Sequence, residues 1–213
     1  MNRIIITASA GLLLASLALS GAQAQGTKNF TLRAGGFFPT DGGVKKALGN
    51  PWFAAGGDLV VKNTTAGALT SAATLNSIEP LVYIDYASKS KTVDGFKNEG
   101  SALGVGIGAR YFAPSEVIKV VRPYIAAGAG LYFIHGKTTQ TVTVDSNPPP
   151  APSLTPNVTT TTSSSKSKTN FGFKVNGGVE FAQNYVLDVA YWNAGKVQGV
   201  SLNGYTVSLG LRF

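Results

Sequence analysis

The chain lacks cysteine and has few charged residues for its length. Without cysteine, neither a disulfide framework nor a thiolate metal site can form. Asp, Glu, Lys and Arg make up only 13% of the 213 residues, and there is a single histidine, His135. Beyond the N-terminal region, the longest apolar candidate for a membrane helix, residues 123–134, is too short and is rich in glycine. If the mature protein lies in a membrane, it must cross it as a closed β-barrel.

The N-terminal 24 residues have the three parts of a secretory signal peptide. Arg3 supplies the positive charge, residues 4–19 are almost wholly apolar, and Ala22 and Ala24 form a small-x-small cleavage site. A permanent transmembrane helix is the alternative, but the apolar core is short and ends at a cleavable motif. We expect residues 1–24 to be removed on export. Residues 25–213, about 190 in number, are then enough for one domain with its own core.

Alternation of apolar with small or polar residues recurs throughout the mature sequence. A period of two is typical of strands with two unlike faces. Eight segments show it, each near the ~9–11 residues that a tilted membrane strand requires: residues 30–38, 53–62, 78–87, 101–112, 121–135, 170–181, 185–192 and 204–213. No amphipathic helix is expected among them. The pattern predicts an all-β fold, an eight-stranded antiparallel up-and-down transmembrane β-barrel.

The connections alternate between long and short, as they do in bacterial barrels with long outer loops and short periplasmic turns. We expect outer loops at residues 41–51, 89–98, 136–169 and 193–203, and tight turns at 113–119 and 182–184. Residues 136–169 include the low-complexity run DSNPPPAPSLTPNVTTTTSSSKSKTN and are expected to form a long flexible loop. The connection 63–77 departs from the pattern, because it is expected to be short and is not.

The charges of the eight segments share one face, opposite the apolar positions. A charge facing lipid at mid-depth would cost roughly 2–4 kcal/mol for Arg or Lys, so the segregation has a physical cause. Inside a barrel, opposite charges can pair with one another. The lumen network expected from this face comprises Arg33, Asp58, Lys62, Glu79, Asp85, Arg110, Arg122, Lys174, Glu180, Asp188 and Arg212.

Outward aromatic residues gather toward both ends of the expected strands. Such belts mark the two interfaces of a membrane. A soluble β-sandwich would also alternate, but it would show neither the two belts nor charges of both signs on one shared face. The barrel therefore explains more of the pattern than the sandwich does.

Several motifs, in their order along the chain, resemble the small eight-stranded outer-membrane barrels. After the signal peptide come TLRAGGFF, ALGVGIGARYF, RPYIAAGAGLYF, GFKVNGGVEF and the terminal YTVSLGLRF. This family includes the OmpA transmembrane domain, OmpX and OmpW, and the resemblance covers essentially the whole mature chain. It implies a location in the bacterial outer membrane and assembly by the barrel-assembly machinery. The assembly signal it implies is the last strand, with Tyr205, Val207, Leu209, Leu211 and Phe213.

Support for catalysis in the sequence is weak. Barrels that modify lipid A, the deacylases and palmitoyl transferases, need a His beside a Ser, yet His135 is followed by Gly136 and Lys137. The glycines at 104, 106 and 108 lack the spacing and the context of a nucleotide-binding loop. They either make room for lumen side chains or leave a small cavity. We expect no enzyme, no cofactor and no metal site, with a lipid A-modifying acyl enzyme as the remote alternative.

The sequence leaves two functions open. The first is a non-catalytic barrel with a side-chain-filled lumen, contributing to envelope structure or surface interactions. The second is a narrow channel for small hydrophobic molecules, as the resemblance to OmpW implies. The net charge of +8 comes without an aromatic-basic platform for nucleic acid. Lysines near the outer rim suit outer-membrane lipid and lipopolysaccharide phosphates instead. We expect no nucleic-acid partner, and a monomer.

Overall fold

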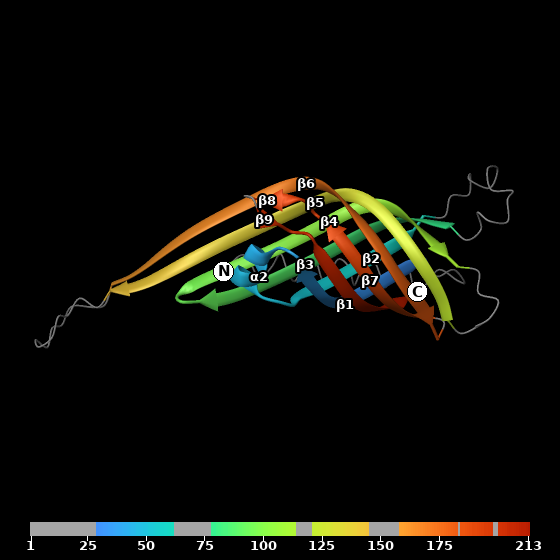
Figure 1. Ribbon diagram of the computed structural model, residues 1–213, viewed down its shortest axis with the longest axis horizontal. Coiled ribbons are helices and arrows are strands. Elements are labelled where there is room, and N and C mark those ends of the chain that lie inside the picture. Colours follow the sequence, from blue (N-terminus) through green and yellow to red (C-terminus); the bar gives the residue numbers. More distant parts are fainter. Residues whose placement is uncertain (1–28, 62–77, 114–120, 145–157, 183, 198–199) are drawn as a thin grey trace, which may run out of the picture.

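The barrel closes through eight antiparallel strands in the order β1-β10-β7-β6-β5-β4-β3-β2 (Figure 1). The computed structural model describes residues 29–61, 78–113, 121–144, 158–182, 184–197 and 200–213. The barrel strands are β1 (Phe30–Pro39), β2 (Trp52–Val60), β3 (Ile78–Val93), β4 (Phe96–Phe112), β5 (Val121–Val144), β6 (Val158–Phe181), β7 (Tyr185–Asn193) and β10 (Gly204–Arg212). The predicted all-β up-and-down barrel is confirmed. Among the described residues, no helix has the length and apolar character needed to cross a membrane.

The first and last strands form the seam of the barrel. β1 pairs with β10 from Thr31 opposite Arg212 to Pro39 opposite Gly204. One residue further, the Phe213 N–H donates to the Phe30 carbonyl at 2.7 Å, and the Phe30 N–H donates to the Phe213 carbonyl at 3.1 Å. The alternation of apolar and small residues in the terminal segment therefore reflects a strand that faces lipid on one side and the lumen on the other.

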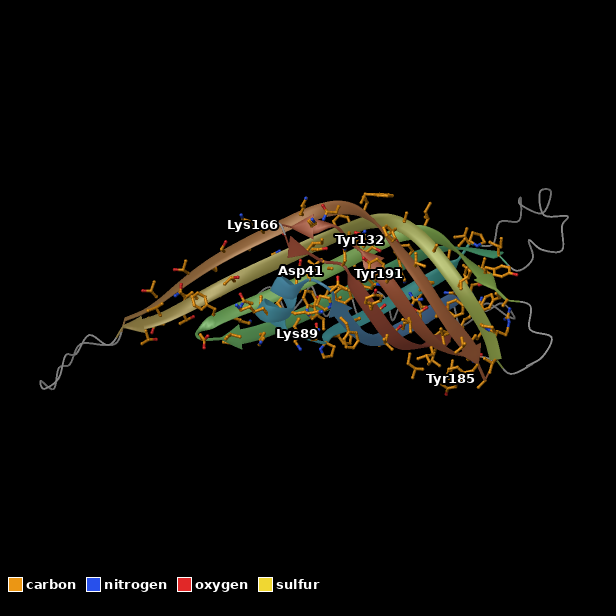
Figure 2. All side chains as sticks on the ribbon, viewed as in Figure 1. Asp41, Lys89, Tyr132, Lys166, Tyr185 and Tyr191 are labelled. Atoms are coloured by element: carbon orange, nitrogen blue, oxygen red, sulfur yellow. The ribbon has the colours of Figure 1, made fainter. Side chains whose placement is uncertain are left out.

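The outer surface of the barrel is apolar over most of its strands. Outward side chains from different strands are well exposed, among them Phe53, Ile107, Ile125, Phe171, Val189 and Leu209. A contiguous apolar surface of this extent is unfavourable in water. It matches the lipid-facing band of a transmembrane barrel, with aromatic residues such as Tyr185 at one end of the band (Figure 2).

Two hairpins extend well beyond the other strands. β1, β2, β7 and β10 have nine or ten residues, about the length of a membrane crossing, whereas β3 and β4 have 16 and 17. The prediction of a loop at residues 89–98 is wrong. β3 and β4 are joined by a two-residue turn at Asp94 and Gly95, whose φ angles of 50° and 78° suit a type I′ hairpin.

The prediction of a flexible loop over residues 136–169 is wrong for most of its length. β5 and β6 have 24 residues each and stay paired up to Val144 opposite Val158. In Figure 1 they run far past the barrel body, at the end opposite the C-terminus. The cause is the threonine content, since β-branched residues favour strands and threonines interact across them. Thr143 Oγ1 and Thr159 Oγ1, for example, are 3.3 Å apart. Residues 145–157 lie outside the described part.

A short helix, which the sequence did not lead us to expect, lies at the mouth of the barrel. α2 (Gly42–Leu48) begins after Asp41, whose Oδ1 accepts hydrogen bonds from the N–H groups of Gly43 (2.8 Å) and Val44 (3.1 Å). The other carboxylate oxygen of Asp41 accepts a hydrogen bond from the Ser201 N–H at 3.0 Å. Ser201 belongs to a small hairpin of β8 (Lys196–Val197) and β9 (Val200–Ser201). Asp41 therefore starts the helix and also ties it to this hairpin.

Candidate functional site

Charged side chains from five strands meet in one network inside the barrel. Both terminal guanidinium nitrogens of Arg33 donate to the Asp58 carboxylate, at 2.5 Å and 2.8 Å. Arg110, two strands away on β4, donates to the same carboxylate. Arg33 also contacts Asp85 at 3.3 Å, and the Lys174 ammonium donates to Asp85 at 2.7 Å. The result is a continuous chain of alternating charges across the interior.

This network is almost fully withdrawn from solvent. The exposed fraction is 1% for Arg110, 2% for Asp58 and 5% for Arg33. An isolated ion in such a place would be strongly destabilising, whereas a paired and hydrogen-bonded one is tolerated. The geometry therefore explains how so many ionisable residues can occupy the centre of the barrel.

A second group of charges continues the network toward the end that carries Phe213. Arg212 donates to Glu180 at 2.9 Å and to Glu79 at 2.6 Å. Arg110 lies 3.8 Å from Glu79, which joins the two groups. Arg122 lies 3.8 Å from Glu180, but its side chain is half exposed. The network thus ends at the rim with Arg122.

The remaining residues predicted for the network fall into two cases. Asp188 is buried, and it accepts hydrogen bonds from two neutral groups, the Tyr124 hydroxyl at 2.6 Å and the Asn176 amide at 2.7 Å. Lys62 lies outside the described residues. So do Ala22 and Ala24 of the predicted signal peptide. The described interior holds five carboxylates and five cations: Asp58, Glu79, Asp85, Glu180, Asp188, Arg33, Arg110, Arg122, Lys174 and Arg212.

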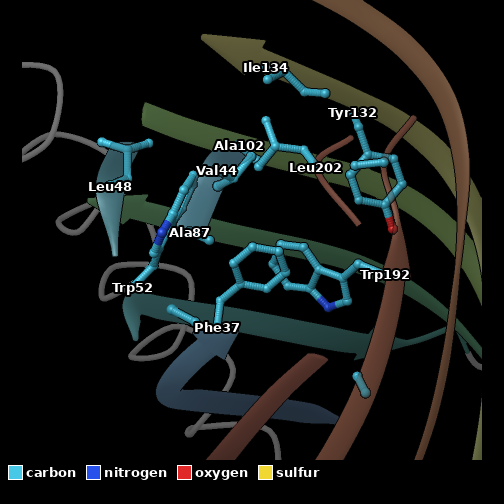
Figure 3. Close-up of a cluster of buried hydrophobic side chains, with 13 residues drawn as sticks. Phe37, Val44, Leu48, Trp52, Ala87, Ala102, Tyr132, Ile134, Trp192 and Leu202 are labelled. Carbon is cyan, nitrogen blue, oxygen red and sulfur yellow. The ribbon is translucent and has the colours of Figure 1, made fainter. Parts of the chain in front are cut away.

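A layer of aromatic side chains, which the sequence reasoning missed, closes the interior on one side of the charges. This side faces the hairpin end, the end of the barrel that carries the two extended hairpins β3–β4 and β5–β6. The ring of Phe37 lies 5.2 Å from that of Trp192 and 5.6 Å from that of Trp52, and the Tyr132 ring is 6.3 Å from Trp192 (Figure 3). The signal for this layer was present, because inward parity follows from the charges. Phe37 lies four residues after the inward Arg33 and therefore shares its face.

Helix α2 extends this aromatic layer toward the hairpin end. Val44 and Leu48 are buried in the same cluster as Trp52, Ile134 and Leu202 (Figure 3). Side chains spaced four apart lie on one face of a helix, so both point into the mouth. From the charges to the helix, the interior is occupied by packed side chains.

Glycines on the inward face make room for bulky lumen residues. A Cβ atom at Gly106 would lie 2.5 Å from the Tyr83 hydroxyl, and one at Gly104 would lie 2.7 Å from the Tyr132 ring. This favours the first of the two alternatives left open for these glycines. Two cavities among the lumen side chains measure about 10 Å³ each. A cavity of that size holds one water molecule at most.

His135 lies on the outward face at the hairpin end, beside a serine. Its Nδ1 is 2.9 Å from the Oγ of Ser167, which strand pairing brings directly opposite. The sequence reasoning missed this serine because it considered only the sequence neighbours of His135. A hydrolytic triad also needs a group that orients the histidine. Glu99 is a carboxylate on the same face of β4, but among the described residues the ion pairs it forms are with Lys97 at 2.9 Å and with Lys137 at 4.0 Å, and not with His135.

Within the residues that the structure describes, no group of three or more histidine, aspartate or glutamate side chains could hold a metal ion.

The tie between Asp41 and Ser201 predicts a pH-sensitive attachment of α2. Hydrogen bonds from the backbone N–H groups of Ser201 and Val44 hold the pKa of the Asp41 carboxyl below its usual range. The charged form makes these bonds, so the attachment is present at neutral pH and is lost as the pH falls through the lowered pKa. We expect Asp41→Ala to speed amide hydrogen exchange at Val44 and Ser201 at neutral pH. Exchange as slow as in the unchanged protein would contradict this, and Asp94→Ala serves as a control.

Comparisons with known proteins lead to the same architecture. No protein-family model matches the chain, and no curated protein matches it. Among solved structures, Neisserial surface protein A is similar over 86% of this chain and 93% of its own, with a TM-score of 0.51 and 17% sequence identity. The fold is that of a small outer-membrane β-barrel.

Two further similar structures differ from each other in what they do. Ail, the attachment invasion locus protein of Yersinia pestis, solved with the heparin analogue sucrose octasulfate, has 14% identity and a TM-score of 0.42, covering 87% of this chain and 97% of its own. The outer-membrane enzyme PagL has 15% identity and a TM-score of 0.41, covering 86% and 98%. At these identities the similarity concerns the fold, which does not fix a function.

Proposed function

We propose that the protein is a non-catalytic barrel of the bacterial outer membrane that acts through its hairpin end, in envelope structure or in surface interactions. The observation that carries this proposal is the filled interior, in which buried ion pairs lie beneath packed aromatic rings. Eight strands enclose a space just wide enough for side chains to fill it. Since a channel needs a continuous opening, the narrow-channel alternative is the less favoured.

The hairpin end carries the chemistry for anionic partners. Lysines are concentrated there, on α2, on the extended strands and on β8: Lys45, Lys46, Lys89, Lys91, Lys97, Lys137, Lys166, Lys168 and Lys196. Lys97 and Lys137 take outward positions just beyond the exposed ring of Phe133. If that ring marks the membrane interface, these two ammonium groups lie at the level of lipid phosphates. We infer that lipopolysaccharide phosphates are their partners.

Exchange of both outward lysines for glutamine tests this partner. In nanodiscs, lipopolysaccharide should raise the thermal unfolding temperature of the unchanged protein, because a ligand of the folded state stabilises it. In the Lys97→Gln, Lys137→Gln double variant most of that rise should be lost. The matched control is Lys45→Gln with Lys46→Gln, which removes the same charge from α2 at the mouth. Equal rises in all three proteins would contradict the assignment.

The orientation of the barrel is tested by cysteine labelling. Because the chain has no cysteine, an introduced cysteine is the single position that can be labelled. Bacterial barrels extend further on the outer side than on the periplasmic side, so the extended β3–β4 hairpin, and with it the turn at Asp94, should be at the cell surface. On intact cells, a membrane-impermeant maleimide should label an Asp94→Cys variant. It should label Ala113→Cys, at the opposite end of β4, only after the outer membrane is opened. Labelling of the second variant alone would reverse the orientation.

An acyl enzyme is a second candidate, supported by the contact between His135 and Ser167. Such an enzyme would release fatty acid from lipopolysaccharide, with Ser167 as the nucleophile. Under our proposal, the purified protein in vesicles releases none. Release that disappears in Ser167→Ala and persists in the neighbouring control Ser165→Ala would replace the proposal by the enzyme.

A further inference from the structure

A cleft of about 300 Å³ opens between helix α2 and the inner face of β4, β5 and β6. Its apolar side is made by Val44, Ala47 and Leu48 of α2 together with Trp52, Ile134 and Leu202. These residues belong to the cluster that closes the barrel, apart from Ala47. The cleft therefore has an apolar floor, and Figure 3 shows the cluster that forms most of it.

Two paired glycines create this space. Gly100 and Gly136 are opposite each other in the β4–β5 register. At Gly100 the Leu48 side chain of helix α2 occupies the free space, since a Cβ atom there would lie 2.7 Å from it. At Gly136 a Cβ atom would meet nothing within 4 Å. The absent side chain of Gly136 thus keeps a position open in the wall of the cleft, and this backbone can accept a larger residue.

The polar side of the cleft favours an anion. Lys166 lies opposite Gly136 on β6 (Figure 2), and Asn98, Thr138 and Ser164 line the same side. The Asn98 side-chain oxygen accepts a hydrogen bond from Thr138 at 2.9 Å, which positions both groups. Among the described ion pairs, those that involve cleft-lining residues join Glu99 to Lys97 and Lys137, and Lys166 takes part in none. Its ammonium group is available for an acid of opposite charge.

We propose that this cleft binds one small amphipathic carboxylate of the medium-chain fatty-acid class. The apolar chain lies on the floor between Leu48 and Ile134, and the carboxylate accepts hydrogen bonds from Lys166. A volume of about 300 Å³ is at the lower end for ligand pockets, which suits a short chain and excludes a whole lipid. The molecule is held and not conducted, because the packed rings of Phe37 and Trp192 lie beneath it. This site is additional to the proposed surface role.

Bromo-octanoate, with bromine at the chain end, is a suitable probe because bromine quenches tryptophan fluorescence on contact. The chain has two tryptophans, so a Trp192→Phe background leaves Trp52, which lines the cleft, as the sole reporter. In nanodiscs we expect saturable quenching of Trp52. Quenching by probe dissolved in the lipid rises in proportion to its concentration, so the saturable part alone reports binding to a site.

Gly136→Leu fills the cleft and should abolish the saturable quenching, whereas Gly42→Leu, at a position that also has open space but lies outside the cleft, should keep it. Lys166→Gln should weaken binding about tenfold, as expected for loss of a charge-assisted hydrogen bond. Heat-modifiable migration checks that each variant folds. Unchanged quenching in folded Gly136→Leu would overturn the site. Equal affinity for bromo-octanol and bromo-octanoate in the parent protein would overturn the carboxylate assignment. Neither result depends on whether the lumen conducts ions.

Discussion

Replacing Asp58 by alanine should lower the free energy of unfolding by about 3–5 kcal/mol, and by less where water can reach the site. The reason is that Asp58 accepts hydrogen bonds from both Arg33 and Arg110. Its loss leaves two buried guanidinium groups with only their longer contacts, Arg33 with Asp85 at 3.3 Å and Arg110 with Glu79 at 3.8 Å. Urea unfolding in lipid vesicles, followed by tryptophan fluorescence, measures the effect.

Two further variants show whether the loss comes from uncompensated charge. Glu99→Ala removes a carboxylate from an exposed ion pair with Lys97, so it should cost less than about 1 kcal/mol. Adding Arg110→Met to Asp58→Ala should restore part of the lost stability, because one of the two poorly compensated buried cations is then gone. If Asp58→Ala is no more destabilising than Glu99→Ala, the buried network does not stabilise the fold in the way proposed here.

Deleting Phe213 should remove most of the folded protein from the outer membrane while export continues. The resemblance to outer-membrane barrels implies that the last strand is the assembly signal. The structure adds a second reason, because the backbone of Phe213 forms two hydrogen bonds with Phe30 at the seam. Heat-modifiable migration of outer-membrane fractions measures the folded amount. An unchanged amount would count against the assembly signal.

Two substitutions separate the side chain of Phe213 from its backbone. Phe213→Ser keeps the seam hydrogen bonds, so reduced insertion in this variant would point to recognition of the aromatic ring. Tyr185→Ser is the matched control, since Tyr185 is also outward, is exposed to a similar degree and pairs across from Leu211 near the same rim. The control should insert normally. Equal losses in both would show that any aromatic residue at this rim matters.

Much of the fold follows from the alternation of residues and the segregation of charge. These patterns predict eight strands, their order and the inward position of Arg33 and Arg110, because a period of two fixes which face each residue takes. They do not set strand length outside the membrane. The Asp94-Gly95 dipeptide is a strong hairpin signal that could have corrected the second outer loop. The threonine run of β6 has high strand propensity but needs β5 as a partner, which no local pattern shows.

The sequence predicts which residues belong to the interior network, but it does not predict the contacts between them. Parity places Asp188 in the lumen, but its hydrogen bonds to Tyr124 and Asn176 depend on side chains from three strands. The same parity would have placed Phe37, Tyr132 and Trp192 inside. Helix α2 was missed because seven residues give too little of a helical period to stand out from a loop. Its position follows from burial of Val44 and Leu48 in tertiary packing.

The filled lumen is the centre of this account, and ion conductance across planar bilayers tests it most directly. The purified, folded protein should give little or no stable conductance, because ion pairs and packed rings occupy the interior. A large and steady conductance of the unchanged protein would contradict the filled lumen and would favour a channel instead.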